Sequence, residues 1–245
     1  MGTTNYVSLS LATALERSLD LAAHNMANAS TAGYKAQHPI LEAVDPANTG
    51  DSTQAVNYVQ DKGIFVDMAQ GSLVPTGNPL DVAVNGDAFL GYEAPGGEIA
   101  YGRDGRLTVD PEGQLVTLGG SPVVDVSGAP ITIPAEVGTS VTIALDGTIT
   151  DQNGGVIGRI GLFKVDNPNQ LAPIGNGLFL EGGAVAEQTE EARLSQGYIE
   201  QSNVKPVVEM IHLMDIQRAY ERAVKLMSDE SELTKQAIQR LGRVV

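Results

Sequence analysis

Apolar residues recur every three or four positions at both ends of this chain, and a different pattern fills the middle. Because an α-helix turns once every 3.6 residues, this alternation keeps one apolar stripe on one face, as in a coiled-coil seam. The N-terminal stripe contains Ala12, Leu15, Leu19, Ala22, Met26 and Ala29. The C-terminal stripe contains Met210, Leu213, Gln217, Tyr220, Val224, Met227, Ser231, Thr234, Ile238 and Leu241. The pattern predicts a long amphipathic helix at each end, and two distant seams favour an assembly subunit over an enzyme.

The residues that flank each stripe predict where the helices begin and end. The first helix is expected over residues 4–30, with Gly33 as a C-terminal stop because glycine tolerates the left-handed conformation. The last helix is expected over residues 203–241 with Asn203 as its N-cap, and Pro206 is tolerated in a first turn. A single shorter helix covers only one stripe of a helix this long, so we expect neighbouring subunits to order both ends.

Residues 76–200 show the signals of β-structure. Short runs alternate between apolar and polar residues, and pairs that end in glycine separate them. Such pairs favour tight hairpins, because both central residues of the turn adopt positive φ. The pairs are Asn85-Gly86, Asp104-Gly105, Glu112-Gly113, Asp146-Gly147 and Asn153-Gly154. No helical stretch of about ten residues interrupts them, which favours an antiparallel β barrel or sandwich.

The patterns together predict an α+β chain in three parts. Residues 1–35 and 203–245 form a paired, coiled-coil-like helical assembly domain, and residues 76–200 form the β-rich outer domain. Residues 36–75, rich in Pro and Gly, form an extended connector with β segments between them.

The net charge of −15 is concentrated in the middle of the chain. Residues 1–37 sum to 0 and residues 201–245 to +1, whereas residues 76–200 sum to −12. An acidic middle repels phosphates, so nucleic acid is not an expected partner. The nearly neutral ends can pack against copies of themselves.

Several classes of site and segment are not expected. The chain has no Cys, which excludes disulfides, thiol catalysis and Cys-bound zinc. His24, His38 and His212 are far apart, and residues 151–155 lack the third acidic or amide position and the distal Glu of a calcium loop. No catalytic constellation, metal site or cofactor site is predicted. No run of about 18 apolar residues predicts a membrane span, and the uncharged first fifteen residues lack the basic start of a cleaved signal peptide.

Four segments of the sequence are similar to one known family. The run LDLAAHNMANASTAGYK at residues 19–35 resembles the N-terminal signature of bacterial flagellar rod and hook proteins. Matching motifs follow in the same order at residues 76–87, 101–105 and 197–204. The short length and single β region exclude the hook protein itself, and the stretches at residues 5–10 and 61–71 are most similar to proximal rod subunits.

The resemblance implies a structural role. Terminal helices of this family pair and line a hollow tube, with the β domain further out, and the rod transmits motor torque. The implied partners are copies of the chain, other proximal and distal rod subunits, and the flagellar type III export apparatus. The implied location is the basal-body rod in the periplasm, reached without a cleaved signal peptide. Lys205 stands where the family usually has an Asn helix cap, which is why we place the cap at Asn203.

The expected assembly interface combines the two seams with a polar cluster at the end of the first helix. Asn25, Asn28 and Gly33 are interpreted as a structural lock, and the alternative is an ordinary polar helix end. The interface residues are Leu15, Leu19, Ala22, Asn25, Met26, Asn28, Gly33, Tyr34, Met210, Leu213, Gln217, Tyr220, Val224, Leu226, Met227, Ile238 and Leu241.

Two other functions compete with a proximal rod subunit. One is a distal rod subunit of the same family. The other, from a different class, is a soluble β-barrel binding module or enzyme whose helices only dimerise it. Removal of about 30 N-terminal and 40 C-terminal residues discriminates between the classes, because it abolishes assembly but leaves a binding module or enzyme active.

Overall fold

The computed structural model describes residues 2–44 and 58–241 and has an α+β fold with mostly antiparallel sheets. The chain divides into two compact units. The helical unit contains Met1–Ala27, Gln37–Phe65 and Lys205–Val245, and the β unit contains Asn28–Ala36 and Val66–Val204. Part of the expected connector, residues 45–57, lies outside the described residues.

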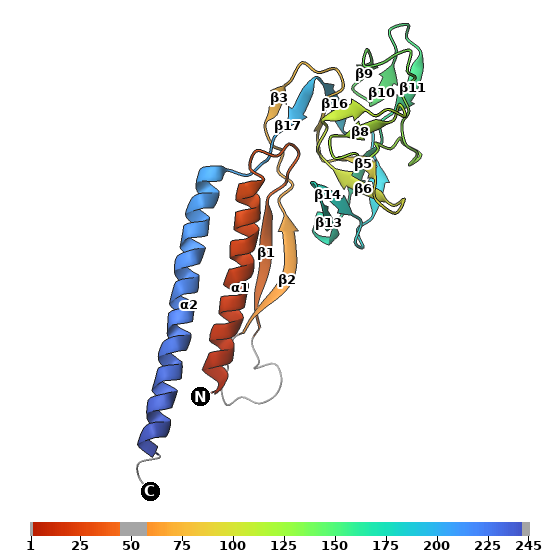
Figure 1. The fold of residues 1–245 in the computed structure, drawn as a ribbon. Helices are drawn as coiled ribbons and strands as arrows, with labels where there is room; N and C mark the ends of the chain where they lie inside the picture. The colour runs from red at the N-terminus through yellow and green to blue at the C-terminus, as the bar shows by residue number, and fades with distance from the viewer. Residues whose placement is uncertain (1, 45–57, 242–245) are drawn as a thin grey trace. The chain divides into compact units, whose positions relative to one another are not determined.

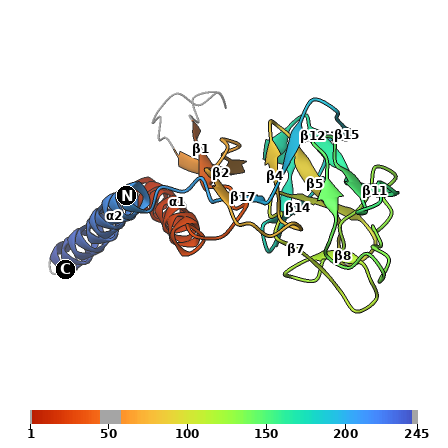
Figure 2. The same cartoon turned by 90° about the horizontal axis from the view of Figure 1, so that it is seen from above.

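Two long helices dominate the helical unit. Helix α1 spans Gly2–Ala27 and helix α2 spans Pro206–Leu241. They lie side by side and run in opposite directions, as Figures 1 and 2 show, and Asn25 near the end of α1 donates a hydrogen bond to Glu209 near the start of α2. Strands β1 (Gln37–Val44) and β2 (Tyr58–Val66) form a two-stranded sheet, and Val59 N of β2 donates to Ser10 Oγ of α1.

Both predicted helix boundaries need correction. Helix α1 ends at Ala27 because the following residues form turns, so Gly33 is six positions beyond the helix and is not its stop signal. Helix α2 begins at Pro206, and the backbone N–H of Glu209 donates to the carbonyl of Lys205. Asn203 is therefore not the N-cap. Its side chain instead binds backbone groups of the β unit, as described below.

The β unit is built from short strands in several small sheets and one large one. The largest sheet has six strands in the order β13-β14-β6-β5-β12-β15. Its edge strands are not hydrogen-bonded to each other, so the described strands form no closed barrel, and the predicted barrel alternative is wrong. The strands are β3 (Leu73–Pro75), β4 (Val82–Asn85), β5 (Phe89–Glu93), β6 (Ile99–Gly102), β7 (Leu107–Val109), β8 (Leu115–Thr117), β9 (Thr142–Ile143), β10 (Thr148–Thr150), β11 (Val156–Arg159), β12 (Leu162–Val165), β13 (Ala172–Gly175), β14 (Leu178–Leu180), β15 (Ala186–Gln188), β16 (Arg193–Gln196) and β17 (Tyr198–Glu200).

Hairpins form at three of the five glycine-containing pairs. The pairs at residues 112–113, 146–147 and 153–154 connect β7 to β8, β9 to β10 and β10 to β11, and each pair of strands is antiparallel. The other two pairs do not connect the strands of a hairpin. Residues 85–86 follow β4, which pairs with β16, and residues 104–105 follow β6, which pairs with β5 and β14. In both cases the strand after the turn pairs with a later strand and not with the strand before the turn: β5 pairs with β6, and β7 pairs with β8.

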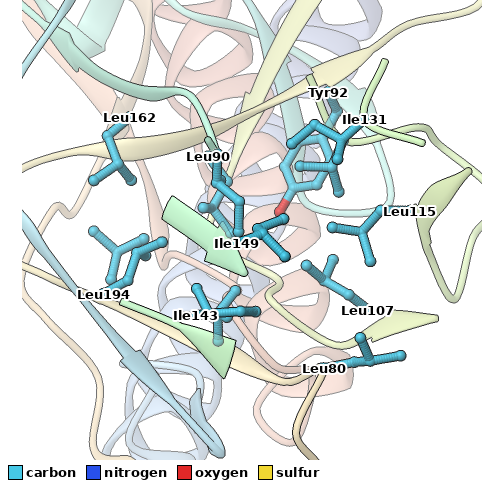
Figure 3. Packing of buried hydrophobic residues seen from close by; sticks show 14 of the residues in the cluster. Leu80, Leu90, Tyr92, Leu107, Leu115, Ile131, Ile143, Ile149, Leu162 and Leu194 are labelled. Carbon is cyan, nitrogen blue, oxygen red and sulfur yellow. The ribbon is translucent and has the colours of Figure 1, made fainter. Parts of the chain in front are cut away.

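Both faces of the large sheet are buried. Because side chains alternate across a strand, Leu90 and Tyr92 of β5 join one apolar cluster while Phe89 joins the other. Leu162 and Phe163 of β12 divide between the clusters in the same way. Figure 3 shows the larger cluster, in which side chains from several sheets converge. These apolar clusters position the strands of the β unit, whose polar contacts are described below.

Candidate assembly interface

A narrow stripe of α2 is buried within the helical unit. Glu209, Ile216 and Ala223 are the buried residues of α2, and the residues four positions after each, Leu213, Tyr220 and Met227, are half-buried. Together they repeat at alternating spacings of four and three, as the sequence pattern requires. Leu213, Tyr220 and Met227 belong both to this buried stripe and to the predicted seam. At the positions between, the buried residue is the one that precedes the predicted residue in the sequence, as Ile216 precedes Gln217.

Most of the other predicted seam residues of α2 lie on the surface of the chain, and the predicted residues of α1 are more buried. In α1, Ala22 is buried, while Leu15, Leu19 and Met26 are half-buried. In α2, six of the candidate residues are exposed: Met210, Gln217, Val224, Leu226, Ile238 and Leu241. Several apolar side chains of α2 are therefore uncovered within one chain.

Asn25 ties the end of α1 to its neighbours within the helical unit. It is fully buried, its Nδ2 donates to Gln37 O (2.8 Å) and Glu209 Oε1 (3.1 Å), and its Oδ1 accepts from Gln37 N (2.9 Å). One amide thus satisfies both backbone groups at the start of β1, as a neighbouring strand would. Asn25 thereby joins the end of α1 to the start of β1 and to α2.

Asn28, Gly33 and Tyr34 belong to the β unit, whereas Asn25 belongs to the helical unit. Asn28 is half-buried and accepts a hydrogen bond from Thr31 Oγ1 to its Oδ1 (3.1 Å). Gly33 has φ +68°, and its N–H donates to Glu200 O (2.8 Å). Tyr34 is buried in a small apolar cluster of the β unit.

Glu200 is the centre of a buried charged cluster in the β unit. Its Oε1 accepts from Lys35 Nζ (2.7 Å) and Gly71 N (2.9 Å), and its Oε2 accepts from Arg103 Nη1 (3.1 Å). The three charged side chains are each 1% exposed. One carboxylate therefore joins three segments that are far apart in the sequence.

Further contacts fix the two cations of this cluster. Lys35 Nζ also donates to Ala69 O (2.8 Å), and Arg103 Nη2 donates to Gly86 O (2.8 Å). The Arg103 guanidinium carbon lies 5.4 Å from the centre of the Phe89 ring, within cation–π range. Burial lowers the pKa of the Lys35 ammonium, and the Glu200 carboxylate opposes this shift.

Asn203 joins the same segments from a second point. Its Oδ1 accepts from Ala36 N (2.8 Å), and its Nδ2 donates to Asp67 O (2.9 Å) and Ala69 O (3.1 Å). The chain passes between the two units at residues 27–28, 36–37, 65–66 and 204–205. The contacts of Glu200 and Asn203 join the segments of the β unit that lie next to these crossing points.

Comparisons with known proteins find relatives over nearly the whole chain. A family described as the flagellar basal body rod FlgEFG protein C-terminal matches residues 195–240, and one described as the flagellar hook protein FlgE/F/G D1 domain matches residues 83–151. The chain is 42% identical to the flagellar basal-body rod protein FlgF of Caulobacter vibrioides over 242 residues, which cover 98% of each chain. The chain belongs to the FlgF family of flagellar basal-body rod proteins.

Other relatives agree with this membership. The FlgF protein of Mesorhizobium japonicum is 36% identical over 97% of each chain. A FlgG rod protein of Buchnera aphidicola is 31% identical over 90% of this chain and 93% of its own length. FlgF-family proteins are structural proteins and not enzymes. Among the described residues no cluster of three or more acidic or histidine side chains is placed to hold a metal ion, and no described helix is long and apolar enough to cross a membrane.

The sequence reasoning missed the charged cluster of this FlgF-family chain, although a signal for it was present. Lys35, Arg103 and Glu200 each lie inside one of the segments that carried the resemblance, beside glycine and tyrosine residues. In each motif, a charged side chain that follows glycine and tyrosine within three residues was the available clue. What the sequence could not indicate is that the three charges meet at one point.

Proposed function

We propose that this chain is a structural subunit of the proximal rod of the flagellar basal body. It polymerises through α1 and α2 with copies of itself and with other proximal and distal rod subunits, and it transmits motor torque. One observation carries the proposal: α2 presents large apolar side chains to solvent along its whole length. They are Val207, Val208, Met210, Ile211, Met214, Val224, Leu226, Leu233, Ile238 and Leu241.

The lengths of the helices explain this exposure. Helix α2 has 36 residues and α1 has 26, so α1 covers one face of α2 and leaves the others open. Exposed apolar side chains in such numbers are typical of protein–protein interfaces, because water contact with them is unfavourable. Neighbouring subunits in a helical tube supply the missing cover.

The charged cluster supports the mechanical part of the proposal. Torque must pass along the chain wherever it leaves the β unit, and Glu200 and Asn203 join those segments by short, buried hydrogen bonds. Cross-linked segments share a load, whereas separate strands would bend one at a time.

Export and location follow from the same proposal. The FlgF-family chain reaches the rod in the periplasm through the flagellar type III export apparatus and keeps its N-terminus. Mass spectrometry of the chain from isolated basal bodies tests this, and we expect the uncleaved N-terminal peptide. A uniform truncation after an N-terminal segment of about 15–30 residues would instead indicate a cleaved signal peptide.

A charge on the exposed face of α2 tests polymerisation. Leu226 is 54% exposed, so Leu226→Asp leaves the fold of the single chain intact but places a charge in the proposed subunit contact. We expect loss of motility and of rod incorporation in cells that lack the native gene. Ser228→Asp, an exposed polar position two residues further on, is the matched control and is expected to assemble. Normal incorporation of Leu226→Asp would contradict the proposed interface.

A further inference from the structure

Each helix of the helical unit carries an exposed apolar patch at its beginning. The α2 patch consists of Val207, Val208, Met210, Ile211 and Met214, which are 42–72% exposed. The α1 patch contains Tyr6 and Leu9, which are 66% and 50% exposed. Each patch follows helical spacing, so its members share one side of their helix.

The two patches cannot cover each other within one chain. Because α1 and α2 are antiparallel, their beginnings lie at opposite ends of the helix pair (Figure 1). Asn25 marks the end of α1 that contacts Glu209, at the start of α2. Leu9 precedes Asn25 by sixteen residues, which is about 24 Å along the helix. The α1 patch is therefore roughly that far from the α2 patch.

Both patches are also uncharged, unlike the rest of the helices. Helix α1 has no charged side chain before Glu16. Helix α2 has only Glu209 before Asp215, and Glu209 is buried. Contact between the patches therefore removes apolar surface from water without burying an unpaired charge or bringing like charges together.

We propose that the α2 patch of one copy binds the α1 patch of a second copy, head to tail along the helix axes. This inference rests on the proposed rod function and specifies one of its contacts. Two different patches at opposite ends of one molecule form a heterologous interface, which repeats and builds an open polymer. With all copies in one orientation, the two helix beginnings overlap antiparallel, and Leu9 lies beside Val208.

Disulfide trapping tests this contact, because the chain contains no Cys. Full-length Leu9→Cys is mixed with full-length Val208→Cys that carries a size-altering tag, and the mixture is oxidised. We expect the mixed disulfide dimer to exceed both same-variant dimers several-fold, since disulfides form only where the Cα atoms approach within about 7 Å. Leu233→Cys is the matched control. It lies on the same helix, is 65% exposed compared with 58% for Val208, and is expected to show no enrichment with Leu9→Cys.

Two outcomes would overturn the inference. One is equal trapping of Leu9→Cys by the Val208 and Leu233 variants, including no trapping by either. The other is preferential trapping between Glu16→Cys and Arg218→Cys, which indicates copies packed side by side instead of head to tail, because the Asn25–Glu209 contact places positions 16 and 218 at the same height of the antiparallel pair. Failure of this contact is separable from failure of the rod function. If rods incorporate the chain without the 9–208 link, only the contact is wrong, whereas a link in solution with no incorporation contradicts the rod role.

Discussion

Replacement of Glu200 by glutamine tests whether the buried charged cluster holds the β unit together. The carboxylate accepts hydrogen bonds on both oxygens, from Lys35 and Gly71 on one and from Arg103 on the other. Glutamine keeps one acceptor oxygen, removes the negative charge and points an NH2 group at a donor. Two buried cations then face each other without a counter-ion.

The expected cost follows from burial. Breaking a buried ion pair by removing one partner costs about 3–5 kcal/mol, because an uncompensated charge remains inside. The matched control is Glu190→Gln, since Glu190 also pairs with an arginine, Arg159, at 3.2 Å, but its side chain is 82% exposed. Exposed pairs contribute about 0–1 kcal/mol. The two variants carry the same chemical change and differ in solvent exposure.

Urea unfolding followed by far-ultraviolet circular dichroism measures the difference. With a slope of about 2 kcal/mol/M, Glu200→Gln lowers the unfolding midpoint by about 1.5–2.5 M, and Glu190→Gln lowers it by less than about 0.5 M. Lys35→Met added to Glu200→Gln should cost less than Lys35→Met alone, because the lysine has already lost its counter-ion. Equal midpoints for Glu200→Gln and Glu190→Gln would refute the reasoning.

Three further predictions concern single residues. Gly33→Ala, at φ +68°, places a Cβ in steric overlap with the backbone of Arg103, and should cost clearly more stability than the ~1 kcal/mol of backbone strain expected for Gly77→Ala, whose Cβ meets no atom within 4 Å. Equal losses of stability in urea unfolding would contradict the packing argument. Asn25→Ala leaves the backbone N–H and C=O of Gln37 without their amide partner and should destabilise the helical unit by about 1–3 kcal/mol. Hydrogen exchange at the Gln37 amide should become faster, and unchanged exchange there would count against the lock. The backbone N–H and hydroxyl of Thr148 lower the pKa of Asp146 below its ordinary value of 3.8. The Asp146 carboxylate therefore stabilises the fold above pH 3.8, and this stabilisation is lost as the pH falls through the lower folded-state pKa. Carboxyl NMR titration with a midpoint at or above 3.8 would be inconsistent with these hydrogen bonds.

The sequence by itself determined the features that depend on neighbouring residues. The spacing of Leu213, Tyr220 and Met227 predicted a long C-terminal helix, because residues three and four apart share a helix face. Glycine-containing turns predicted the hairpins at residues 112–113, 146–147 and 153–154, in which sequential strands pair. The motif resemblance predicted the family, which the comparisons confirmed.

Only the tertiary structure decided the features that depend on distant residues. The pairing of β4 with β16 and of β3 with β17 joins segments over 100 residues apart, and no local pattern selects such partners. At alternate positions the buried residue of α2 is one residue before the predicted one, as at Ile216 and Gln217. The observed and the predicted stripes are both partly apolar, so only packing decides which of them is buried. Lys35 and Glu200 are 165 positions apart, and their charges are tolerated in the interior only because the fold brings them within 2.7 Å.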